Sequence, residues 1–78
     1  MPSEKALKGC IELIARDIAQ DYDLTFIRLT GNPYDQTLIK TAYLTFRDSD
    51  GKVIRIPLPK SRMTDLYTYL EYALGSLK

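Results

Sequence analysis

Three tyrosines in the segment TDLYTYLEYALG, residues 64–75, are the side chains with the clearest potential for binding chemistry. On a helix that turns about 100° per residue, Tyr67, Tyr69 and Tyr72 cannot all face a core. Tyr67 flanks the leucine stripe of this segment, whereas Tyr72, and to a lesser degree Tyr69, point outward. Exposed tyrosine is enriched at protein interfaces because it offers apolar area at low entropic cost. We predict a partner-binding patch at Tyr69 and Tyr72; the alternative is that both rings only cover the core rim.

A second candidate surface combines a tyrosine with arginines on predicted strands. Side chains alternate between the two faces of a strand, which places Tyr43, Arg47 and Arg55 on the face away from the core. One register of the preceding strand adds Phe26 and Arg28 to this face. Such a platform suits a protein interface or the stacking of single-stranded bases. The alternative is a solvated face with no partner.

A third candidate lies where the last predicted helix begins. Lys60 and Arg62 flank Ser61 there, so two cations would meet the free amide groups of a helix start. This arrangement suits a phosphate group. The alternative is ordinary helix capping by Ser61 or Thr64.

The residues for catalysis are few. The chain has no histidine, which is the commonest general acid or base, and one cysteine, so the usual zinc sites cannot be built within it. Cys10 falls on an apolar helix stripe, where a buried thiol is inert. Asp48 and Asp50 belong to a turn signal, DSDG. We therefore expect a protein that is not an enzyme and that holds no metal or cofactor.

Two amphipathic helices are predicted, one before and one after the chain's other elements. Ser3 is a suitable N-cap for the first helix, which ends at residues 21–23. Its apolar stripe follows three- and four-residue steps and comprises Leu7, Cys10, Ile11, Ile14 and Ile18. Gly9 within it either permits a close contact or delays the helix start. The stripe of the last helix comprises Met63, Leu66, Leu70, Leu74 and Leu77.

Three strands are expected between the helices, over Leu24–Thr30, Thr37–Arg47 and Lys52–Pro59. The loop Gly31–Gln36 and the turn Asp48–Gly51 connect them. The residues expected to face the core from the last two strands are Leu38, Ala42, Leu44, Phe46, Ile54, Ile56 and Leu58. A proline in the third strand cannot donate to a ladder, which indicates an edge.

These elements predict a single α+β domain over residues 1–78. Short connections favour a three-stranded antiparallel meander. Each helix has one apolar stripe, so both should pack on the same face of the sheet in a two-layer α-β-β-β-α arrangement. The other sheet face stays open.

Composition narrows the class of partner. Eleven basic and ten acidic residues give a net charge of +1, which lowers the expectation of a dedicated nucleic-acid binder.

The single cysteine excludes an internal disulfide, and no apolar run approaches the length of a membrane span. The charged N-terminal residues do not resemble a signal peptide. We therefore expect a cytoplasmic protein that does not enter a membrane.

The element order, with Lys60 and Arg62 opening the last helix, resembles the double-stranded-RNA-binding domain over most of the chain. The resemblance implies a nucleic-acid-binding module. That family contacts its target with the first helix, a loop between the first two strands and a lysine cluster at the last helix. Here the loop reads GNPYDQT and carries no histidine, and the cluster is reduced to two cations.

The leading hypothesis is a small non-enzymatic binding protein that covers part of a larger protein as an inhibitor, regulator or small subunit. Phage- and plasmid-encoded modulators are often of this size. The alternative is the nucleic-acid-binding module. A homodimer formed through a strand edge or the last helix is a third expectation.

Overall fold

Helix, three strands and helix follow one another in the computed structural model, which describes residues 4–33 and 41–77. The elements are α1 (Glu4–Asp21), β1 (Thr25–Thr30), β2 (Tyr43–Arg47), β3 (Val53–Pro57), the short 3-10 helix η1 (Lys60–Arg62) and α2 (Leu66–Gly75). The strands form one antiparallel sheet in the order β1-β2-β3. The predicted fold class, a small α+β domain with a three-stranded meander, is confirmed.

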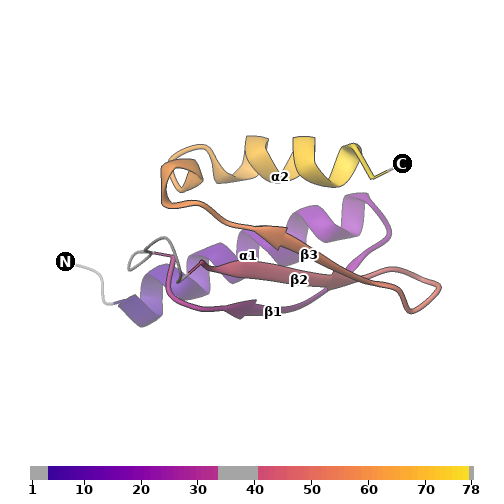
Figure 1. Ribbon diagram of the computed structural model, residues 1–78, viewed down its shortest axis with the longest axis horizontal. Helices are drawn as coiled ribbons and strands as arrows, with labels where there is room; N and C mark the ends of the chain where they lie inside the picture. The colour runs from indigo at the N-terminus through magenta and orange to yellow at the C-terminus, as the bar shows by residue number, and fades with distance from the viewer. Residues whose placement is uncertain (1–3, 34–40, 78) are drawn as a thin grey trace.

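The two helices form a layer on one face of the sheet. In Figure 1, α1 passes behind the strands, and α2 runs beside it along the β3 side. One cluster of buried side chains joins the layers: Ile11, Ala15, Ile18 and Ala19 of α1, Phe26, Ala42, Leu44, Phe46, Ile56 and Leu58 of the sheet region, and Leu66, Leu70 and Leu74 of α2. The inward residues predicted for β2 and β3 that lie in the described ranges are therefore confirmed as core or its border.

The buried face of α1 differs from the predicted stripe. Cys10 is exposed, so the prediction of a buried thiol was wrong. The stripe is centred instead on Ile11, Ala15 and Ile18, and Cys10 lies roughly a quarter turn away from Ile11. Small alanine side chains at the contact let α1 approach the sheet closely. Ser3, the side chain of Leu7 and residues 34–40, with the calls made on them, lie outside the described residues.

A β-bulge in β1 settles the register that the sequence left open. Phe26 pairs with Phe46, but Arg28 pairs with Thr45, so Ile27 is an extra residue in β1. Phe26 therefore joins the core, with its ring 5.5 Å from that of Phe46 between centroids. Arg28 faces the other way. The alternative that placed Phe26 and Arg28 on one face was wrong, because an unbroken alternation was assumed.

The predicted hairpin between β2 and β3 is present, although both strands are shorter than expected. Thr41 and Ala42 precede β2. In the turn, one carboxylate oxygen of Asp48 accepts hydrogen bonds from the backbone amides of Asp50 and Lys52, at 3.0 and 2.8 Å. Gly51 adopts a φ of 85°, a left-handed conformation that favours glycine.

The last helix is held against the first at its C-terminal half. Leu66, Leu70 and Leu74 are buried as predicted, whereas Leu77 is 51% exposed because it follows the end of α2. Tyr22, just after α1, donates a hydrogen bond from its hydroxyl to the carbonyl oxygen of Glu71 at 3.2 Å. Together with the buried leucines, this contact sets which side of α2 faces outward.

Replacing Gly9 with alanine should stabilise the protein. Gly9 lies inside α1, and a Cβ atom built there meets no atom of the described residues within 4 Å, so glycine serves no close contact with them. The substitution should raise the free energy of unfolding by roughly 0.5–1 kcal/mol, since alanine loses less backbone entropy. Urea unfolding followed by circular dichroism measures the change; a loss of stability would show that the glycine is needed.

Candidate functional site

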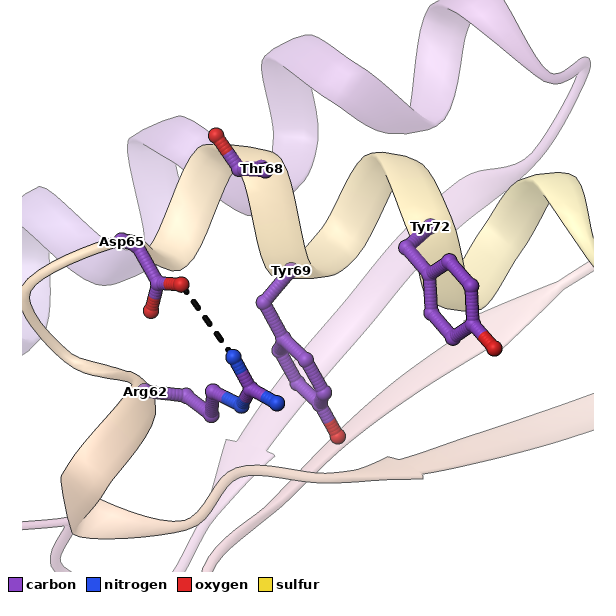
Figure 2. Close-up of a pocket in the computed structure, with 5 residues that line it drawn as sticks. All are labelled: Arg62, Asp65, Thr68, Tyr69 and Tyr72. Carbon is purple, nitrogen blue, oxygen red and sulfur yellow. Dashed lines mark hydrogen bonds and ion pairs between the residues drawn. The ribbon is translucent and has the colours of Figure 1, made fainter.

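Five side chains from η1, α2 and the N-cap of α2 line a surface hollow of about 370 Å³: Arg62, Asp65, Thr68, Tyr69 and Tyr72. Figure 2 shows Arg62 and Tyr69 at its centre, with Tyr72 one turn further along α2. Tyr69 and Tyr72 are three residues apart and so lie next to each other on the helix surface. The structure therefore brings two of the predicted partner-binding residues together with a predicted phosphate-binding one.

Arg62 belongs to this tyrosine surface more than to a separate phosphate site. One guanidinium nitrogen lies 3.2 Å from a carboxylate oxygen of Asp65, and the guanidinium carbon lies 5.5 Å from the centre of the Tyr69 ring. Salt bridge and cation–π contact together restrain a long side chain that would otherwise be mobile. The pair is partly exposed, so it contributes little to stability.

The start of α2 is less favourable to phosphate than the sequence suggested. Neither Ser61 nor Thr64 caps the helix: its N-cap is Asp65, whose side chain makes no capping hydrogen bond. Lys60 and Arg62 lie on η1 instead. A phosphate near these two cations would meet the Asp65 carboxylate and be repelled by it.

Tyr69 is half-buried and attaches α2 to the sheet. Its hydroxyl donates to the carbonyl oxygen of Pro57 at the end of β3. Burial raises the pKa of Tyr69, and the nearby positive charge of Arg62 lowers it less. Tyr69 therefore offers only part of its ring to a partner and also supports the fold.

Tyr72 is the free tyrosine of the surface. It is 77% exposed, against 44% for Tyr67 on the same helix. Tyr67 lies on the α1 side, where desolvation, followed by the carboxylates of Asp21 and Glu71, raises its pKa. Tyr67 was expected to pack at the core edge and is more exposed than that, but it points away from the hollow, whose lining excludes it.

The open face of the sheet carries the second predicted patch. Tyr43, Arg47 and Arg55 all lie on it, because they alternate with the buried Leu44, Phe46 and Ile56. The guanidinium carbon of Arg55 lies 4.3 Å from the centre of the Tyr43 ring. None of these three residues lines the hollow beside α2, although Tyr69 of the hollow bonds to Pro57, the residue paired with Tyr43.

Sequence reasoning missed or left undecided some members of these surfaces. Asp65 and Thr68 were not singled out, although opposite charges three residues apart, as in Arg62 and Asp65, are a readable signal. Arg28 was left conditional because no pattern in the sequence revealed the bulge.

No described helix is both long and apolar enough to cross a membrane.

Comparisons with protein-family models, curated proteins and solved structures found no match for this chain. The resemblance to the double-stranded-RNA-binding domain therefore rests on the order of elements and on Lys60 and Arg62 ahead of the last helix.

Replacing Tyr69 with phenylalanine should lower the free energy of unfolding by roughly 0.5–1.5 kcal/mol. The change keeps the ring but removes the hydroxyl that satisfies the Pro57 carbonyl oxygen. Tyr72→Phe is the matched control: its ring is exposed, so the expected change is within about 0.5 kcal/mol. Equal effects of the two substitutions in urea unfolding would contradict the assigned role of Tyr69.

The stability difference between the wild type and Tyr69→Phe should depend on pH. The pKa of Tyr69 is raised in the folded state. Because folding raises this pKa, the protonated hydroxyl makes its full contribution to the free energy of unfolding below the ordinary tyrosine pKa of about 10. It is lost as pH rises through the raised value, because a phenolate cannot donate to Pro57. Urea midpoints of both proteins between about pH 8 and 11 test this; a difference that grows with pH would refute it.

Proposed function

We propose that this domain is a non-enzymatic binding protein that acts by covering part of another protein. The contact would be made by the η1–α2 surface, which is the hollow lined by Arg62, Asp65, Thr68, Tyr69 and Tyr72. Tyr72 would be the central contact, with Arg62 and the exposed edge of Tyr69 beside it. The observation that carries the proposal is the 77% exposure of Tyr72 at the rim of a hollow that already contains a restrained arginine and a second tyrosine.

The composition of this surface is that of an interface hot spot. Tyrosine and arginine are the residues most enriched where truncation weakens binding most, and such residues cluster around pockets. Burying an exposed aromatic ring contributes up to about 1.5–3 kcal/mol. The entropic cost of binding is reduced, because Asp65 and Tyr69 already restrain Arg62 in the free protein.

An inhibitor, a regulator or a small subunit of a larger protein would each use such a surface. We infer a reducing compartment, the cytoplasm, because Cys10 has no second cysteine in the chain with which to form a disulfide. The competing possibility is that a second copy of this chain binds the same surface through α2.

Tyr72→Ser should weaken partner capture roughly 30-fold, which corresponds to a hot-spot loss of about 2 kcal/mol. The immobilised domain would be incubated with lysate of the source cells, and retained proteins quantified by mass spectrometry. Tyr67→Ser is the matched control, because it removes an exposed tyrosine from the other side of the same helix.

The expected result is a protein retained by the wild type and by Tyr67→Ser but not by Tyr72→Ser. Equal retention by the two variants would place the contact elsewhere. The folded state of Tyr72→Ser would be checked by its urea midpoint, which should change little for an exposed side chain. Sedimentation of the purified wild type detects the self-associating alternative.

A further inference from the structure

We propose that the open face of the sheet binds single-stranded nucleic acid through Arg28, Arg47 and Arg55, with Tyr43 as a stacking surface. This proposal concerns the face of the sheet opposite the helices. It does not rest on the proposed protein contact of α2, and the two can fail separately.

The register places the three arginines around one central residue. Thr45 of β2 pairs with Arg28 of β1 on one side and with Arg55 of β3 on the other, and Arg47 follows two residues along β2. Adjacent strands are about 4.8 Å apart, so the Arg28 and Arg55 backbones are separated by roughly 10 Å, and Arg47 lies about 7 Å along the strand from Thr45. A flexible polyanion can contact all three.

Thr45, at the centre of the three arginines, is only 7% exposed, although neither described helix packs on this face. The long stems of the flanking arginines are suited to shield it. Arg28, Arg47 and Arg55 are themselves exposed, so their charged groups remain in water.

Carboxylates are missing from the described strand positions of this face. The remaining paired positions are threonine, tyrosine, valine and proline: Thr25, Thr30, Tyr43, Thr45, Val53 and Pro57. The unpaired Ile27 of the bulge is half-buried and also carries no charge. The nearest acid in sequence, Asp48, lies on the helix side, where it borders a hollow with Leu24 and Leu74. A chain with a net charge of +1 therefore gathers three positive charges on one face.

Tyr43 and Arg55 add a flat surface to these charges. The 4.3 Å contact holds the guanidinium against the aromatic ring. Both arginine planes and aromatic rings stack on unpaired bases in single-stranded complexes. A base could therefore extend this stack while its flanking phosphates meet Arg28 and Arg47.

The observations favour nucleic acid over a protein partner at this face. Protein interfaces have an apolar core, whereas the described positions here offer Val53 as their one exposed large aliphatic side chain. Nucleic-acid interfaces are much more positively charged. A single strand fits better than a duplex, because no described element projects from the face to enter a groove.

Fluorescence anisotropy tests the proposal with labelled oligo(dT) and oligo(U) of about a dozen nucleotides. Three neutralised phosphates on a single strand predict a log–log salt slope near −2, which is roughly a 20-fold loss of affinity between about 50 and 200 mM salt. Arg28→Ala or Arg47→Ala should reduce the slope by about 0.7, to roughly a 7-fold loss. Arg16→Ala, an exposed arginine on α1 with the same change in net charge, should leave the slope unchanged.

Several outcomes would overturn the proposal. They are the absence of binding at low salt, an equal effect of Arg16→Ala, and an equal affinity for duplex DNA or RNA. Competition by an oligo-glutamate peptide as strong as that by the oligonucleotide would also overturn it, because the face would then recognise acidic protein segments. Unchanged binding by Tyr72→Ser is expected and keeps this test independent of the α2 surface.

Discussion

The pairing of Phe26 with Phe46 on the helix side of the sheet depends on one extra residue in β1. Ile27 is that residue, and it lets Phe26 and Leu29 both turn toward the core while Arg28 turns away. With strict alternation, Phe26 and Arg28 would share a face, so either an aromatic ring would leave the core or a charge would enter it. Both alternatives cost free energy. The bulge therefore places Phe26 in the core and Arg28 on the open face.

The second constraint is the attachment of α2 at two positions. The hydroxyl of Tyr22 binds the backbone of α2, and the hydroxyl of Tyr69 binds the carbonyl oxygen at the end of β3. Together with the three buried leucines, these contacts fix the rotation of a short helix. Tyr72 faces solvent because Tyr69 faces the sheet edge. Tyr69 therefore contributes to the fold, and its position sets the direction in which Tyr72 points.

The two surfaces differ in chemistry because they arise from different elements. The η1–α2 surface mixes aromatic area with a cation whose charge Asp65 offsets, which suits a protein contact. The open sheet face has three arginines with no carboxylate at its described strand positions, which suits a polyanion. A small domain with two such faces could hold a nucleic-acid strand and a protein at once.

The sequence was sufficient to predict the order of elements, the sheet topology, the buried Leu66, Leu70 and Leu74 of α2 and the inward positions of β2 and β3. These features follow from local periodicity, which a single chain displays directly. The sequence was not sufficient to predict the bulge at Ile27, the exposure of Cys10 or the contact between Arg62 and Tyr69. The bulge is a choice between two registers whose energies differ only once α1 covers Phe26. The face of α1 that is buried depends on where α2 lies, and the Arg62 contact depends on the path of η1. The Arg62 contact nevertheless joins residues of a single segment. Tertiary packing decided the other two features, because each depends on residues distant in the sequence.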